Sequence, residues 1–158
     1  MTHRKPVADI TELASTLAPG QRLMGLDLGS KTIGAALSDP GRTIATPTVT
    51  LRRGKFKADA QGLRAMIEEN DVGGLVIGLP LNMDGSEGPR CQSVRQFAAN
   101  LLGEIDIAIA FWDERLSTVS AERVLLEADM TRKRRGEVID KMAAAIILQG
   151  ALDRLAHS

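Results

Sequence analysis

Residues 22–38 decide the fold, and they read Arg22-Leu23-Met24-Gly25-Leu26-Asp27-Leu28, then Gly29-Ser30-Lys31, then Thr32-Ile33-Gly34-Ala35-Ala36-Leu37-Ser38. Two apolar runs, 22–28 and 32–38, flank a short turn, which predicts two strands. A connection this short can join only antiparallel neighbours. The turn Asp39-Pro40-Gly41 then leads to a third run, 43–51, so we expect a three-stranded meander.

A carboxylate inside the first run, Asp27, is the most informative residue of this segment. Burying a carboxylate is costly unless it is paired or bound to a metal ion. Gly25 and Gly29 on either side allow a backbone or a ligand to approach closely. Asp27 could instead only cap the turn at Gly29, but a carboxylate is seldom buried for that purpose. We therefore interpret Asp27 as a site residue.

Beyond the meander, the pattern changes to alternating helices and strands. Apolar periodicity predicts helices at 58–70 and 88–102, strands at 74–78 and 105–112, and two final helices at 117–128 and 137–155. Such alternation implies right-handed crossovers and a parallel extension of the sheet. The expected fold class is α/β, with a mixed five-stranded sheet of three antiparallel and two parallel strands and helices on its faces.

The start of the chain stands apart from this pattern. Apolar residues recur there at helical spacing, and they are Val7, Ile10, Leu13 and Leu17. Pro19-Gly20 closes the segment. We expect residues 1–21 to form an amino-terminal helical extension and residues 22–158 to form a single domain.

The composition narrows the function classes. The 158 residues carry no formal net charge, so nucleic-acid affinity must come from local patches. With three Phe, one Trp and no Tyr, a platform that stacks bases on aromatic rings is not expected. One cysteine, Cys91, excludes an internal disulfide framework and a zinc cluster. No apolar run is long enough to span a bilayer and no signal peptide is evident, which indicates a cytoplasmic protein without a membrane partner.

Two further carboxylates fall where a site is expected. Trp112-Asp113-Glu114-Arg115 ends the last predicted strand, and ligands of open α/β sheets bind beyond the carboxyl ends of parallel strands. Taken alone, Glu114 and Arg115 would be ordinary surface charges. Asp140 is aligned with Ala143, Ala144 and Ile147, so it shares the apolar face of the last helix. It could also be an acidic residue favoured near the start of a helix.

Three carboxylates without a usable histidine favour oxygen-bound Mg²⁺ or Mn²⁺ over zinc. The two histidines, His3 and His157, lie at the ends of the chain. Such ions activate water and stabilise both oxygens of a phosphoryl displacement. We expect the three carboxyl groups to lie close enough to share one or two ions.

Three motifs in order resemble the YqgF family, also called the RuvX or Holliday-junction resolvase family. They are Gly25-Leu26-Asp27-Leu28-Gly29-Ser30-Lys31-Thr32-Ile33-Gly34, Gly78-Leu79-Pro80-Leu81-Asn82-Met83-Asp84-Gly85-Ser86 and Asp113-Glu114-Arg115-Leu116-Ser117-Thr118. The resemblance covers about residues 22–155 and implies a ribonuclease H-like fold. It also implies a nuclease that processes the 5′ end of precursor 16S rRNA, with Asp27, Glu114 and Asp140 as catalytic metal ligands. Preferring Glu114 to Asp113 rests on the resemblance alone.

Polar and basic segments complete the predicted site. The loop 78–88 precedes a helix, and helix amino termini attract phosphate, so we expect Asn82 and Ser86, together with Arg115, to contact substrate. An ordinary strand-to-helix loop is the alternative. The predicted phosphate contacts before the last helix are Arg132, Lys133, Arg134 and Arg135. A second basic cluster, Arg52, Arg53, Lys55 and Lys57, could be either a contact or solvated surface.

Three rival functions remain open at the level of sequence. The substrate could be a branched DNA junction, which would require two active sites and hence a homodimer, whereas an RNA-trimming enzyme could act as a monomer. An ATP-binding module of the actin and Hsp70 type opens with a similar strand-turn-strand, but it needs two such domains. A non-catalytic nucleic-acid-binding module could also keep the fold.

Overall fold

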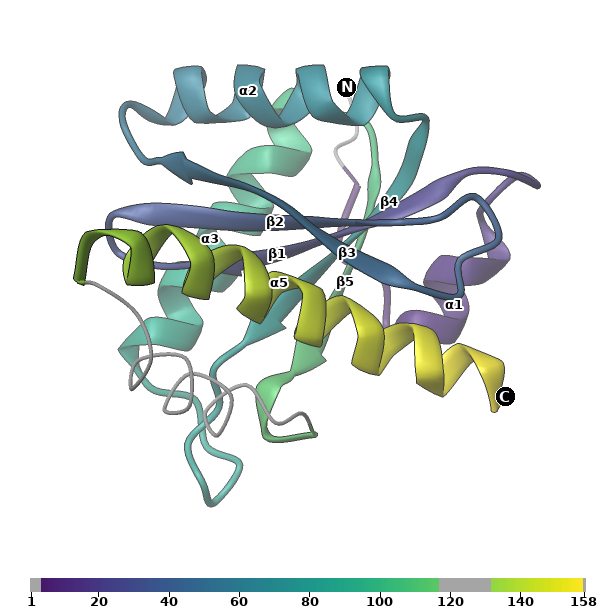
Figure 1. Cartoon of the computed structure of the whole chain (residues 1–158). Coiled ribbons are helices and arrows are strands. Elements are labelled where there is room, and N and C mark those ends of the chain that lie inside the picture. Colours follow the sequence, from purple (N-terminus) through teal and green to yellow (C-terminus); the bar gives the residue numbers. More distant parts are fainter. Residues whose placement is uncertain (1–3, 117–131, 158) are drawn as a thin grey trace.

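The computed structural model describes residues 4–116 and 132–157, and the side chains of 4–116 and 138–157 (Figure 1). In chain order the elements are α1 (Ile10–Ser15), β1 (Arg22–Leu28), β2 (Thr32–Ser38), β3 (Ala45–Arg52), α2 (Phe56–Glu69), β4 (Val72–Leu79), α3 (Pro89–Glu104), β5 (Ala108–Asp113), the 3₁₀ turn η1 (Glu114–Leu116) and α5 (Arg132–Ala156). The predicted helix at 117–128 lies outside the described residues.

The five strands form one mixed sheet in the order β3-β2-β1-β4-β5. β2 pairs antiparallel with both β1 and β3, while β4 pairs parallel with both β1 and β5. The predicted meander with a parallel extension is therefore confirmed. As a consequence, β1, β3, β4 and β5 all end at the same edge of the sheet.

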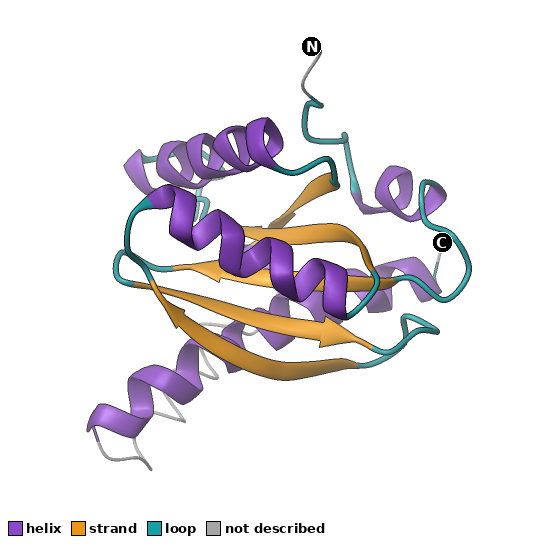
Figure 2. Cartoon of the chain, turned by 90° about the horizontal axis from the view of Figure 1, so that it is seen from above, coloured by secondary structure: helices purple, strands orange, loops and turns teal. Residues whose placement is uncertain are grey.

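Helices cover both faces of the sheet (Figure 2). On one face, Leu26, Ile77 and Ile109 pack with buried residues of α2 and α3. On the other face, Leu23, Val76 and Ala110 pack with the apolar stripe of α5, including Ala144 and Leu148. Successive strand residues point to opposite faces, so this division fixes the face on which each residue of the sheet lies.

The amino-terminal helix α1 is shorter than predicted, and its apolar side chains pack into the core between the sheet and α5. Its side chains Ile10 and Leu13 are buried with α5, and Asp9 caps it by accepting the Glu12 N–H at 2.9 Å. Val7 lies before the helix, where its N–H donates to the carbonyl of Ile109 in β5 at 2.8 Å. The division between an extension ending at residue 21 and a domain starting at 22 stays a prediction.

Two other element boundaries differ from the sequence prediction by three residues or more. The last strand begins at Ala108 rather than at residue 105, because the Ile105 N–H still closes helix α3 by donating to Leu101. Helix α5 begins at Arg132 rather than at 137, so the predicted basic cluster belongs to its first turns. Among the described helices, none has the length and apolar character needed to cross a membrane.

Candidate active site

On the face of the sheet that α5 covers, four residues form a row across neighbouring strands: Gly34, Asp27, Gly78 and Trp112. Asp27 pairs with Gly34 of β2, and in the parallel pairing Gly78 of β4 stands opposite Trp112 of β5. Since Leu26 pairs with Ile77, the next position along each strand places Asp27 beside Gly78. Asp27 is 4% exposed and is the one buried charged side chain in the described part of the chain.

The two glycines beside Asp27 leave room for groups from outside the sheet. At Gly34 a Cβ would overlap the backbone carbonyl of Asp140, so helix α5 can lie this close only over a residue without a side chain. At Gly78 a Cβ would lie 3.1 Å from Oε1 of Glu114 and 2.5 Å from Cδ1 of Ile147. The side chain of Glu114 and the backbone of Asp140 therefore lie over the neighbours of Asp27, one on each side.

The half-buried carboxylate of Asp140 is turned toward the sheet. The hydroxyl of Thr32 on β2 donates a hydrogen bond to Oδ2 of Asp140. Thr32 lies two residues before Gly34, so it points to the same face as Asp27. This contact holds Asp140 over the sheet, above the strand adjacent to that of Asp27.

Asp113 and Glu114 have different surroundings. Asp113 stands opposite Leu79, whose side chain belongs to the α2 and α3 core, so Asp113 points away from the face of Asp27. Its carboxylate accepts hydrogen bonds from the Arg115 guanidinium, including one at 2.7 Å from Nη2, and this contact lowers the pKa of Asp113. Glu114 begins the turn η1 and folds back over Gly78.

The carboxylates do not form a ready-made metal cluster. Among the described residues, no three His, Cys, Asp or Glu side chains lie close enough to hold an ion, contrary to our expectation. Asp27, Glu114 and Asp140 nonetheless lie on one face of the sheet and toward one edge of it, whereas Asp113 lies on the other face. Their chemistry suits Mg²⁺ or Mn²⁺, which bind carboxylates and keep several waters.

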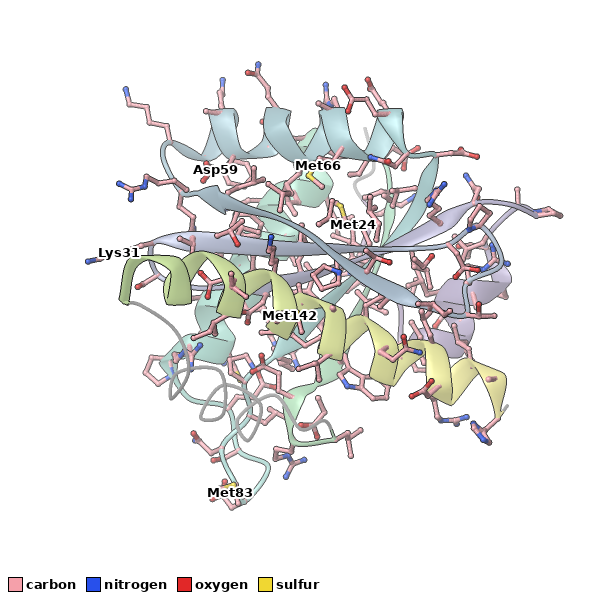
Figure 3. The ribbon with its side chains drawn as sticks, in the orientation of Figure 1. Met24, Lys31, Asp59, Met66, Met83 and Met142 are labelled. Atoms are coloured by element: carbon pink, nitrogen blue, oxygen red, sulfur yellow. The ribbon has the colours of Figure 1, made fainter. Side chains whose placement is uncertain are left out.

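The predicted substrate residues divide into two groups. Asn82 and Arg115 line a cleft of about 930 Å³ together with Glu114, which we call the first cleft. Ser86 is bound inside its own loop: its hydroxyl donates to Asp84 at 2.6 Å and accepts from Nδ2 of Asn82 at 3.0 Å. At the tip of this loop, Met83 is 94% exposed and projects from the body of the protein (Figure 3). The side chains of Arg132, Lys133, Arg134 and Arg135 lie outside the described residues.

Two comparisons agree with this arrangement. The strand order and the acidic side chains at one edge of the sheet define a protein of the ribonuclease H-like fold class. It resembles Thermus thermophilus RuvC, solved with a Holliday junction substrate, with a TM-score of 0.55 at 8% identity, over 87% of this chain and 98% of that one. Residues 21–154 match the family model described as RuvX, Holliday junction resolvase.

Curated relatives are similar over nearly their full length. A protein of Paramagnetospirillum magneticum is 64% identical over 94% of this chain and 96% of its own, and one of Ruegeria pomeroyi is 63% identical over 92% and 95%. Both are named "Putative pre-16S rRNA nuclease". The chain belongs to the RuvX family, and it is by that membership a nuclease, a hydrolase acting on nucleic acid.

Sequence reasoning missed the residues that position the carboxylates. Thr32, Gly34 and Gly78 all belong to motifs quoted above, but their roles depend on which strand and helix lie next to them. The signal that could have found Gly34 is its pairing with Asp27, which follows from the short turn between β1 and β2.

Proposed function

We propose that this protein is a divalent-metal-dependent nuclease that processes the 5′ end of precursor 16S rRNA in the cytoplasm. The observation that carries the proposal is the buried carboxylate of Asp27 between two glycines, with Glu114 over one and Asp140 over the other. The names of the relatives supply the substrate. The same family membership favours a nuclease over an ATP-binding module.

In this proposal Asp27, Glu114 and Asp140 are the metal ligands. Asp27 is fixed in the sheet, Glu114 reaches over β4 from the turn after β5, and Asp140 is kept on the same face by Thr32. When bound, Mg²⁺ or Mn²⁺ would activate water and stabilise the attacking and leaving oxygens of the phosphodiester. Asp113 is the weaker candidate because it points to the other face and is paired with Arg115.

The remaining proposed residues hold the substrate. Arg115 is oriented by Asp113 at the rim of the first cleft, where a guanidinium can bind the phosphate backbone next to Glu114. Asn82 lines the same cleft, and Ser86 shapes its loop. The basic cluster 132–135 begins the helix that carries Asp140, which makes it a further candidate for phosphate contact.

The test compares two substrates with one preparation. Labelled precursor 16S rRNA and a four-way DNA junction are each incubated with Mg²⁺, with Mn²⁺ and with EDTA. We expect metal-dependent cleavage of the RNA near its 5′ end, and we expect Glu114→Gln to lose it. Asp113→Asn, which acts through the orientation of Arg115, should weaken substrate binding but retain most of the turnover at saturating substrate. Cleavage of the junction alone would instead assign a resolvase, and sedimentation would then be expected to show a homodimer rather than a monomer. Binding of both substrates without cleavage of either would assign a non-catalytic module.

A further inference from the structure

A second cleft lies beside the first at the carboxyl edge of the sheet. Its volume is about 510 Å³, and it is lined by the β1–β2 turn (Gly29, Ser30), the two residues that follow β3 after Arg52 (Arg53, Gly54) and the start of α3 (Pro89, Arg90, Ser93). Pro89 and Arg90 also line the first cleft, so the two clefts share one wall. The turn that forms one wall carries Lys31, labelled in Figure 3.

The lining of the second cleft is basic. It includes two arginines, Arg53 and Arg90, and two hydroxyl side chains, Ser30 and Ser93, while no Asp or Glu belongs to the lining in the described part of the chain. Guanidinium and hydroxyl groups are donors that suit phosphate oxygens.

One of the two cations is held in place before any ligand arrives. Nη1 of Arg53 donates to the carbonyl of Gly29 at 2.6 Å, and its guanidinium lies 5.1 Å from the centre of the Phe97 ring. Phe97 is itself fixed by an edge-to-face contact with Phe56 at 5.5 Å. A side chain ordered in this way loses little conformational entropy when it binds a phosphate.

We propose that the second cleft binds a backbone phosphate of the substrate strand outside the scissile position, through Arg53 and Arg90. This inference rests on the proposed function and extends it: the strand would pass from the first cleft, beside Glu114, over Pro89 and Arg90 into the second cleft. Phosphate contacts of this kind set the position of the strand and supply salt-dependent affinity without reading sequence.

The experiment centres on Arg90→Ala, because Arg90 is exposed on α3 and its removal leaves the core unchanged. Binding of labelled RNA spanning the 5′ end of precursor 16S rRNA is measured in EDTA at several salt concentrations, and kcat and KM are measured in Mg²⁺. We expect about 10-fold weaker binding, a salt slope lower by about 0.7, a raised KM and an unchanged kcat. Arg90→Lys, which keeps the charge, should recover most of the slope.

The matched control is Arg154→Ala, which removes an exposed arginine from the last turn of α5, at the opposite end of that helix from the site (Figure 1). We expect it to bind and cleave as the unmodified protein does. If Arg90→Ala behaves like this control while the unmodified protein binds and cleaves RNA, the inference is overturned and the proposed function stands. If the unmodified protein neither binds nor cleaves either nucleic acid, both are overturned.

Discussion

The backbone carbonyl of Asp140 on α5 lies directly against Gly34 on β2, where any side chain would overlap it. Gly34 is also the cross-strand partner of Asp27. One missing side chain therefore sets the distance between the last helix and the sheet, and it brings the segment that carries Asp140 next to the strand that carries Asp27. Stability and the geometry of the candidate site depend on the same contact.

Substitution of Gly34 by Ala should destabilise the protein markedly. The new Cβ must displace the backbone of α5, and overpacking of this kind costs about 3 kcal/mol or more. For a chain of this length the melting temperature should fall by roughly 6–12 °C. Gly103→Ala is the control, because a Cβ there meets nothing within 4 Å, and it should leave the melting temperature unchanged or slightly raised. Equal melting temperatures for the two variants would contradict the observed contact.

Neutralising Asp27 should abolish cleavage and leave the fold intact. Asp27→Asn keeps the shape of the side chain but weakens its affinity for a cation, so we expect metal-dependent cleavage to fall by more than about 100-fold, since even residues that only support ligands cost 10- to 100-fold. Circular dichroism checks the fold. Asp106→Asn changes an exposed carboxylate before β5, at the other end of that strand, and should retain full activity. Full activity of Asp27→Asn with Mg²⁺ would remove Asp27 from the ligand set.

Removal of the Thr32 hydroxyl should weaken metal binding, because this hydroxyl positions the carboxylate of Asp140. Thr32→Val keeps the size of the side chain but removes the donor, so the Asp140 carboxylate is no longer held over the sheet. We expect the Mg²⁺ concentration for half-maximal cleavage to rise by about 10-fold, and Mn²⁺ binding measured by calorimetry to weaken in parallel. Thr32→Ser, which restores the hydroxyl, should return both values toward those of the unmodified protein. An unchanged metal dependence in Thr32→Val would separate Asp140 from the metal.

Neutralising the basic cluster at the start of α5 should weaken binding more than it slows saturated turnover. Replacement of Arg132, Lys133, Arg134 and Arg135 by Ala removes four cations, and the salt slope of RNA binding should fall by as much as roughly 3 units. The slope is obtained from affinities at increasing salt in EDTA, and kcat is measured separately at saturating substrate. A slope equal to that of the unmodified protein would identify these residues as solvated surface.

Burial should make Cys91 a reporter of unfolding. Burial raises the pKa of the Cys91 thiol, and the negative charge of Glu87 acts in the same direction. Because the thiolate is the reactive form, alkylation of the folded protein at pH 8 should be far slower than that of the unfolded chain. Mass spectrometry of iodoacetamide-treated protein, with and without denaturant, measures the difference. Equal rates in both states would show that α3 does not bury this residue in solution.

Local sequence determined much of this protein. The short turn between the two apolar runs forces β1 and β2 to be antiparallel, and the alternation after β3 forces β4 and β5 to be parallel, because connection length limits which pairings a chain can make. Asp27 could be selected from the sequence for a similar reason, since a carboxylate within an apolar strand needs a function to offset its burial.

Tertiary structure decided what local patterns could not. The two adjacent carboxylates Asp113 and Glu114 are equivalent in a sequence pattern, and only the pairing of β5 with β4 sends Asp113 to the opposite face while Glu114 turns back over Gly78. The hydrogen bond between Thr32 and Asp140 joins residues that are 108 positions apart in the sequence. The contact of α5 with Gly34 joins segments at a similar separation. Arg53 and Arg90 line one cleft only because β3 ends at the same edge of the sheet at which α3 begins. Such contacts depend on packing between distant segments, which periodicity and local spacing do not encode.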